Sequence, residues 1–88
     1  MDVLPLNVEP RAQAVRCTDT ELIVELTDGR VVSTPLVWFP RLANASPDQR
    51  NQLGHGQGIH WPAVDEDISV LGLLAGHPSV EYRKPPTV

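Results

Sequence analysis

The chain of 88 residues is long enough for one small domain, because domains usually run from about 50 to 250 residues. Its formal net charge is −4, and its seven basic residues are spread along the sequence. A domain that binds nucleic acid alone usually has a concentrated basic surface, so we expect no direct nucleic-acid binding. The single cysteine, Cys17, excludes an internal disulfide and a cysteine-based zinc site. No stretch resembles a signal peptide or a membrane span, so we expect a cytoplasmic protein without a membrane partner.

Proline content and weak hydrophobic patterning set the expected domain limits. Residues 1–10 contain two prolines and are expected to form a loose N-terminal arm. Residues 77–88 are polar and rich in proline, which predicts a flexible C-terminal tail. The single folded domain is therefore expected over residues 11–76.

The first half of the chain has the clearest strand pattern. Apolar residues recur at a period of two within residues 21–27, as is typical of a strand with one buried face. Asp28-Gly29 predicts a two-residue hairpin turn, and residues 30–34 form the expected returning strand. The alternating segment 12–19 precedes them, so we expect a three-stranded antiparallel meander. The apolar residues that define its central strand are Leu22, Val24 and Leu26.

Short helices are expected in the middle of the chain. Residues 35–45 are compatible with one or two helical turns that pack on the sheet. A second helix is predicted over residues 47–53, because Ser46 and Gln49 have the spacing of a capping box. Gly54 suits a left-handed cap at the end of that helix.

The segment GHGQGIHWPAVDEDIS, residues 54–69, concentrates histidines, glycines and acids. A fourth strand is predicted at its centre, with Ile59 and Trp61 facing inward and His60 facing outward. Asp65-Glu66-Asp67 then precede an apolar segment in which Ile68, Leu71 and Leu74 recur at helical spacing.

Acidic residues are favourable at the start of a helix, so the acidic run predicts the start of the last helix. Asp67 or Ser69 is the expected N-cap of this helix, and Gly76 is the expected stop. The predicted fold class is α+β: a small two-layer domain with an antiparallel three-stranded meander, a fourth strand and two or three short helices.

The same segment permits two chemical interpretations, neither well supported by spacing. His55, His60, Asp65 and Asp67 could form the site of a metal-assisted hydrolase or nuclease, but they match neither a zinc-finger nor a calcium-loop pattern. Ser69 and Cys17 are possible nucleophiles, but no nucleophile-elbow motif surrounds either residue. We therefore expect no catalytic residues, no metal and no cofactor.

Several motifs together resemble the bacterial family known as domain of unknown function 2442. They are PLVWFPRL at residues 35–42, GIHWPAVDEDIS at residues 58–69 and GLLAG at residues 72–76. The resemblance covers about residues 11–76 and implies a small α+β domain. Members of this family occur alone or joined to a helix-turn-helix module, often beside a gene for another small protein. The resemblance implies an antitoxin-like or partner-binding role, and it carries over no catalytic residue.

We therefore expect a non-enzymatic module that binds a protein partner, as the antitoxin-like or accessory half of a two-gene bacterial pair. The acidic charge favours a basic partner. Two alternatives stay open, the metal-assisted hydrolase and a homo-oligomeric structural accessory domain. The expected contact residues are Trp38, Phe39, His60, Asp65, Glu66 and Asp67.

Overall fold

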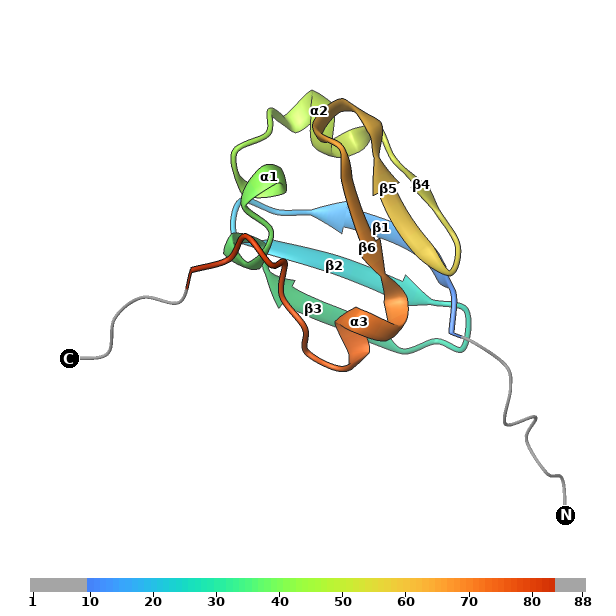
Figure 1. The fold of residues 1–88 in the computed structure, drawn as a ribbon. Coiled ribbons are helices and arrows are strands. Elements are labelled where there is room, and N and C mark those ends of the chain that lie inside the picture. Colours follow the sequence, from blue (N-terminus) through green and yellow to red (C-terminus); the bar gives the residue numbers. More distant parts are fainter. Residues whose placement is uncertain (1–9, 84–88) are drawn as a thin grey trace, which may run out of the picture.

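A computed structural model describes residues 10–83 (Figure 1). The expected N-terminal arm, apart from its last residue, and the last five residues of the expected tail lie outside this range. The described chain forms two three-stranded sheets, with strand orders β1-β2-β3 and β4-β5-β6, and three short α-helices. The predicted α+β class is confirmed. The single fourth strand predicted from the sequence is the middle strand of a second sheet.

The meander is confirmed as β1 (Ala12–Cys17), β2 (Glu21–Leu26) and β3 (Val31–Pro35). Both strand pairs are antiparallel. Leu22, Val24 and Leu26 of β2 have no exposed surface, as their spacing predicts.

The turn between β2 and β3 is longer than the predicted two residues. The Leu26 N–H donates to the Arg30 carbonyl at 2.8 Å, and the Gly29 N–H donates to the Leu26 carbonyl at 3.0 Å. Three residues therefore form the loop, and Gly29 has the left-handed φ of +96° that closes such loops.

The middle of the chain forms a 3₁₀ turn, η1 (Leu36–Trp38), and two helices, α1 (Pro40–Ala43) and α2 (Pro47–Asn51). The predicted capping box is present. The Ser46 hydroxyl accepts from the Gln49 N–H at 3.2 Å, and the Gln49 side chain accepts from the Ser46 N–H at 2.9 Å. The predicted left-handed cap at Gly54 is wrong, because α2 ends at an extended Gln52 and Gly54 begins the next strand.

The second sheet contains β4 (Gly54–His55), β5 (Gly58–Trp61) and β6 (Glu66–Ser69), with a 3₁₀ turn, η2 (Pro62–Val64), before β6. Within β5, Ile59 and Trp61 are buried and His60 is exposed, as predicted.

The acidic run does not start a helix. Residues 66–69 pair with β5, so they form an edge strand, and α3 (Val70–Leu74) begins only after them. Of the two expected N-caps, Ser69 is right, because its hydroxyl accepts from the Gly72 N–H at 2.8 Å. Gly76 follows the helix with a φ of +76°, in agreement with the predicted stop.

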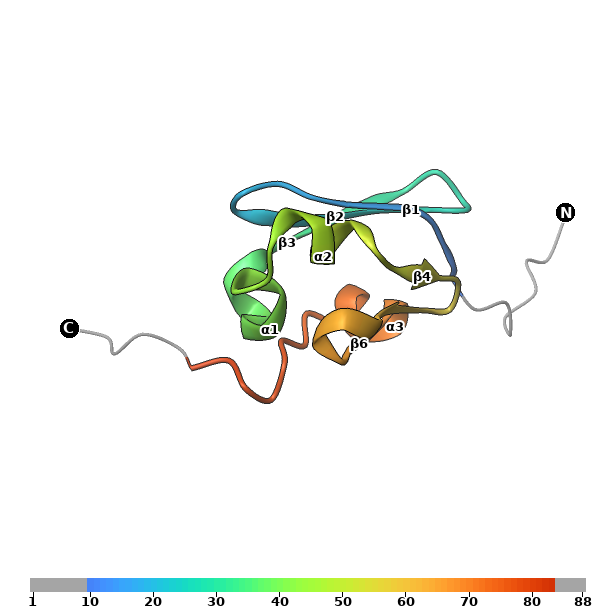
Figure 2. The ribbon, with the colours of Figure 1, turned by 90° about the horizontal axis from the view of Figure 1, so that it is seen from above.

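The core lies between the meander and a second layer that includes α1, β6 and α3 (Figure 2). The helical stripe predicted from Ile68, Leu71 and Leu74 is wrong: Ile68 lies in a strand, and Leu71 and Leu74 are 54% and 38% exposed. Val70 and Leu73 are the buried residues of α3. Within residues 10–83, no helix combines the length and apolar character needed to cross a bilayer.

Candidate functional site

The three acids of the run occupy three different environments. Asp65 ends η2 in the left-handed region, with a φ of 52°, and its side chain is 86% exposed. Asp is one of the few non-glycine residues that adopt this conformation readily. Glu66 and Asp67 then alternate across β6, so Glu66 is buried and Asp67 is exposed. Glu66, one of the expected contact residues, therefore faces the core.

His60 and Asp67 form a cross-strand pair on the outer face of the second sheet. His60 Nδ1 lies 2.6 Å from Asp67 Oδ1. The Val70 N–H donates to the Gln57 carbonyl, so the alternation of the ladder makes residues 60 and 67 a non-hydrogen-bonded pair. Side chains approach most closely in such pairs, which explains the short contact.

The four residues of the hydrolase alternative are not brought together. His55 Nδ1 lies 3.0 Å from the Ala12 carbonyl, so this ring joins β4 to β1. Within residues 10–83, no three His, Cys, Asp or Glu side chains gather closely enough to hold a metal ion.

Neither candidate nucleophile is activated in this structure. The Ser69 hydroxyl caps α3. Burial raises the pKa of the Cys17 thiol, whereas an activated cysteine has a lowered pKa.

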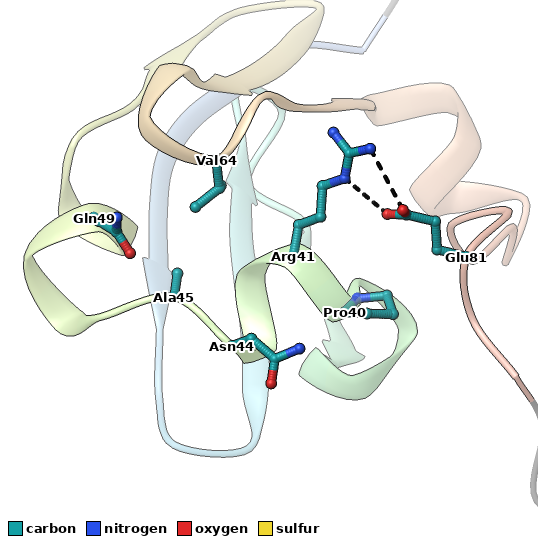
Figure 3. Close-up of a pocket in the computed structure, with 7 residues that line it drawn as sticks. All are labelled: Pro40, Arg41, Asn44, Ala45, Gln49, Val64 and Glu81. Carbon is teal, nitrogen blue, oxygen red and sulfur yellow. Dashed lines mark hydrogen bonds and ion pairs between the residues drawn. The ribbon is translucent and has the colours of Figure 1, made fainter.

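Arg41, which sequence reasoning missed, joins three parts of the chain. Its Nε lies 2.9 Å and its Nη2 lies 3.4 Å from the two carboxylate oxygens of Glu81 (Figure 3). Its Nη1 donates to the Asp65 carbonyl at 2.9 Å. Arg41 therefore ties α1 both to the turn before β6 and to the C-terminal segment. No local pattern indicates this link, because Arg41 and Glu81 are 40 residues apart.

The C-terminal segment 77–83 also contacts η1. The Ser79 N–H donates to the Trp38 carbonyl at 3.0 Å, and the Tyr82 ring lies 6.4 Å from the Trp38 ring. The described contacts thus extend beyond Gly76, the expected limit of the domain. Of the two expected contact residues in this region, Trp38 is partly buried, and Phe39 is only 3% exposed.

One hollow is lined by Arg41 and a second by Glu66, and the two differ in how far their polar groups have hydrogen-bond partners. The larger has a volume of about 610 Å³ and is lined by residues that include Arg41, Asn44, Gln49 and Glu81 (Figure 3). Most of its polar groups already have partners, since Arg41 binds Glu81 and Gln49 completes the capping box.

The smaller cavity, which we call the β6 cavity, has a volume of about 340 Å³ and lies between β6 and residues 77–80. Its lining includes Phe39, Glu66 and Asp67, three of the expected contact residues. Within residues 10–83, the buried Oε2 of Glu66 has no hydrogen-bond partner. Burial raises the pKa of this carboxyl above its ordinary value of 4.5. The unpaired buried oxygen of Glu66 therefore lies at the smaller cavity.

The family model described as "Protein of unknown function (DUF2442)" matches residues 12–79. The chain belongs to the DUF2442 family. The match begins at the first residue of β1 and ends at Ser79, so it covers both sheets and the backbone contact of Ser79 with Trp38.

A solved structure supports the same architecture for this DUF2442 chain. A crystal structure of a protein of unknown function from Rhodospirillum rubrum ATCC 11170 is similar to it, with a TM-score of 0.70 and 34% sequence identity. The similarity covers 84% of this chain and 95% of the other. No curated protein matches the chain.

Proposed function

We propose that this DUF2442 protein is a non-enzymatic module of the bacterial cytoplasm that binds a basic protein partner. In this role it is the antitoxin-like or accessory half of a two-gene pair. The observation that carries the proposal is the position of the acidic run on an edge strand, where another chain can pair with it. A helix cap would instead have used these carboxylates within the fold.

The backbone of β6 has a free side. Residues 66 and 68 face β5 in the alternating ladder, so the N–H and C=O groups of Asp67 and Ser69 point away from β5. The Ser69 carbonyl is the N-cap carbonyl of α3 and accepts the first bond of that helix. The N–H and C=O groups of Asp67 and the N–H of Ser69 are open to an added strand.

The charge at this edge favours a basic partner. The side chains of Asp65 and Asp67 are 86% and 74% exposed, and the chain as a whole carries a net charge of −4. Complementary charge accelerates association and suppresses wrong partners. A hollow of about 510 Å³ on the outer face, beside His60 and Asp67, adds apolar surface next to these carboxylates.

The metal-assisted hydrolase is less well supported than binding. Of its four residues, the structure brings only His60 and Asp67 into contact. The His55 ring contacts a backbone carbonyl, and the Asp65 carboxylate lies 3.8 Å from Arg41.

Co-expression with the product of the neighbouring gene tests the proposal. The wild-type chain is expected to co-purify with that product and to relieve any growth defect that the product causes. The variant Asp65→Asn/Asp67→Asn is expected to associate at least tenfold more slowly at low salt, because it loses two exposed charges but keeps the backbone and the His60 contact. Asn also tolerates the left-handed conformation of residue 65.

The matched control is Asp19→Asn/Asp48→Asn. It changes the net charge equally, but it lies in the β1–β2 turn and in α2. Absence of co-purification, or equal slowing by both double variants, would contradict the proposed binding through β6.

A further inference from the structure

The β6 cavity contains an unusual buried group. Glu66 is 9% exposed, its Oε2 is fully buried, and within residues 10–83 this oxygen has no donor. A buried polar atom without a hydrogen bond destabilises the fold, and nearly all such atoms in folded proteins are paired. Glu66 also interrupts the inward row that it shares with Ile68, where an apolar residue would pack without this cost.

Among residues 10–83, no basic side chain supplies the missing donor. Arg41 is the basic group that acts electrostatically on Glu66. Each of its three guanidinium nitrogens already donates, to the Glu81 carboxylate or to the Asp65 carbonyl. Glu81 and Asp67 add negative charge around Glu66 and oppose Arg41. The surroundings of Glu66 therefore favour a further positive group.

The shape of the cavity fits one side chain. Its volume of about 340 Å³ is at the lower end of the range for small-ligand sites, about 300 to 1,000 Å³. Its apolar lining includes Phe39, Ile68, Pro78 and Val80. Lysine and arginine combine an apolar stem with a charged head, so the stem can contact this lining while the head reaches a carboxylate.

The cavity also lies where a partner strand would arrive. It opens between β6 and residues 77–80, and it is lined by Asp67 and Ser69, whose N–H groups point away from β5. In a strand added beside β6, the residue opposite Glu66 faces the same side of the sheet as Glu66. That residue would enter the β6 cavity.

The geometry points to the β6 cavity as a receptor for one lysine or arginine side chain of the partner, whose charged head pairs with Glu66. This inference rests on the proposed function, because the cation is part of the partner's binding segment. Only the carboxylate form of Glu66 pairs with the cation, so any chain in which Glu66 is protonated releases that proton to solvent on binding. Binding therefore strengthens as pH rises through the pKa of Glu66. The other titratable groups at the cavity are Asp67 and His77 in its lining, with Arg41 and Glu81 beside it.

The test uses the full chain and the probe acetyl-arginine-amide, with its neutral isostere acetyl-citrulline-amide as the comparison. Titration followed by NMR extends to about 20 mM, since a millimolar complex corresponds to only about 4 kcal/mol of binding free energy. We expect saturable shifts at Glu66, Ile68 and Ser79 with the arginine probe and a lowered pKa of the Glu66 carboxyl. We expect no saturation with the citrulline probe.

Two variants test which carboxylate binds the arginine probe. Glu66→Gln is expected to weaken binding of the arginine probe at least tenfold, and Asp19→Asn, in the β1–β2 turn and outside the lining of this cavity, is expected to leave it within twofold. Absence of saturation by the arginine probe, equal binding of both probes, or binding unaffected by Glu66→Gln would overturn the inference. The comparison of the two probes needs no variant, so it holds even if Glu66→Gln perturbs folding. If the partner co-purifies and the probe does not bind, only this inference fails and the proposed function stands.

Discussion

Glu66 and Asp67 are adjacent on β6 but lie in opposite environments. Glu66 is 9% exposed and its Oε2 has no partner among residues 10–83, whereas the Asp67 side chain is 74% exposed and contacts His60. The period of two along a strand causes this difference, because consecutive side chains point to opposite faces. Two carboxylates that look equivalent in the sequence therefore have different surroundings and different roles.

The stability of the domain is expected to depend on the ionisation of Glu66. Its pKa is raised in the folded state by burial, so the folded chain holds this proton more tightly than the unfolded chain does. The tighter proton binding of Glu66 in the folded chain adds to the free energy of unfolding. This contribution is fully present below the unfolded-state pKa, and it is lost as pH rises through the raised folded-state pKa. Glu66→Gln is therefore expected to be more stable than wild type at neutral pH, with a difference that shrinks toward acid pH.

Urea unfolding of both proteins across the acidic and neutral range measures this difference. Asp28 acts in the opposite direction, because the Arg30 N–H and side chain lower its pKa. It is common to both proteins, so subtraction isolates Glu66. A difference independent of pH would show that Glu66 titrates normally.

Arg41 is expected to hold the C-terminal segment against the domain. Arg41→Ala removes two bonds to Glu81 and one to the Asp65 carbonyl, so residues 77–82 should exchange their amide hydrogens faster. The pair is about half exposed, so the cost in unfolding free energy should be small. Arg41→Lys keeps the charge without the planar fork and should give an intermediate exchange rate. Unchanged amide exchange of residues 77–82 in Arg41→Ala would mean that the contacts of Trp38 alone hold this segment against the domain.

The first half of the fold could be predicted because its signals are local. The apolar period of β2 and the Asp28-Gly29 dipeptide lie within a few residues of the contacts that they determine. The capping box at Ser46 and Gln49 is local in the same way. Within the meander only the loop length was wrong, because a turn that contains Asp-Gly also fits three residues when the glycine takes the left-handed position.

The second sheet could be predicted only in part, because its strands are short and one carries a buried acid. β4 has two residues, too few for a period. In β6, Glu66 occupies an inward position and breaks the alternation of apolar and polar residues. The spacing of Ile68, Leu71 and Leu74 also matches one face of a helix, although these residues do not form such a face. Of the expected contact residues, Asp65, Glu66 and Asp67 lie in or beside this strand and His60 pairs with it, whereas Trp38 and Phe39 lie elsewhere. Arg41 and Glu81 were missed because their contact is long-range.

Loss of the α2 capping box is expected to destabilise the domain modestly. Ser46→Ala removes the acceptor of the Gln49 N–H, which costs about 1 kcal/mol at typical N-caps. Ser46→Asp keeps an acceptor at the same position and should retain most of the stability. The midpoint of urea unfolding at constant slope is the measurement, and equal midpoints for Ser46→Ala and wild type would contradict a stabilising role of the box.

Trp61 is expected to be far more important to stability than Trp38. The Trp61 ring has no exposed surface, and its Nε1 donates to the Arg50 carbonyl at 3.1 Å, which ties β5 to α2. Trp61→Phe loses this bond and leaves a cavity, at a cost of about 2 kcal/mol or more. Trp38→Phe, at a partly buried position, should cost less than about 1 kcal/mol. Equal costs in thermal unfolding would contradict the assigned core.

Hydrogen exchange in the complex with the neighbouring-gene product tests the central claim most directly. Binding along the free edge of β6 predicts that the amides of Asp67 and Ser69 exchange more slowly in the complex than in the free chain, because a partner carbonyl then accepts from them. The amides of β1, β2 and β3 serve as the internal reference and should change little. Protection confined to the meander, with Asp67 and Ser69 unchanged, would contradict the assignment of β6 as the binding edge.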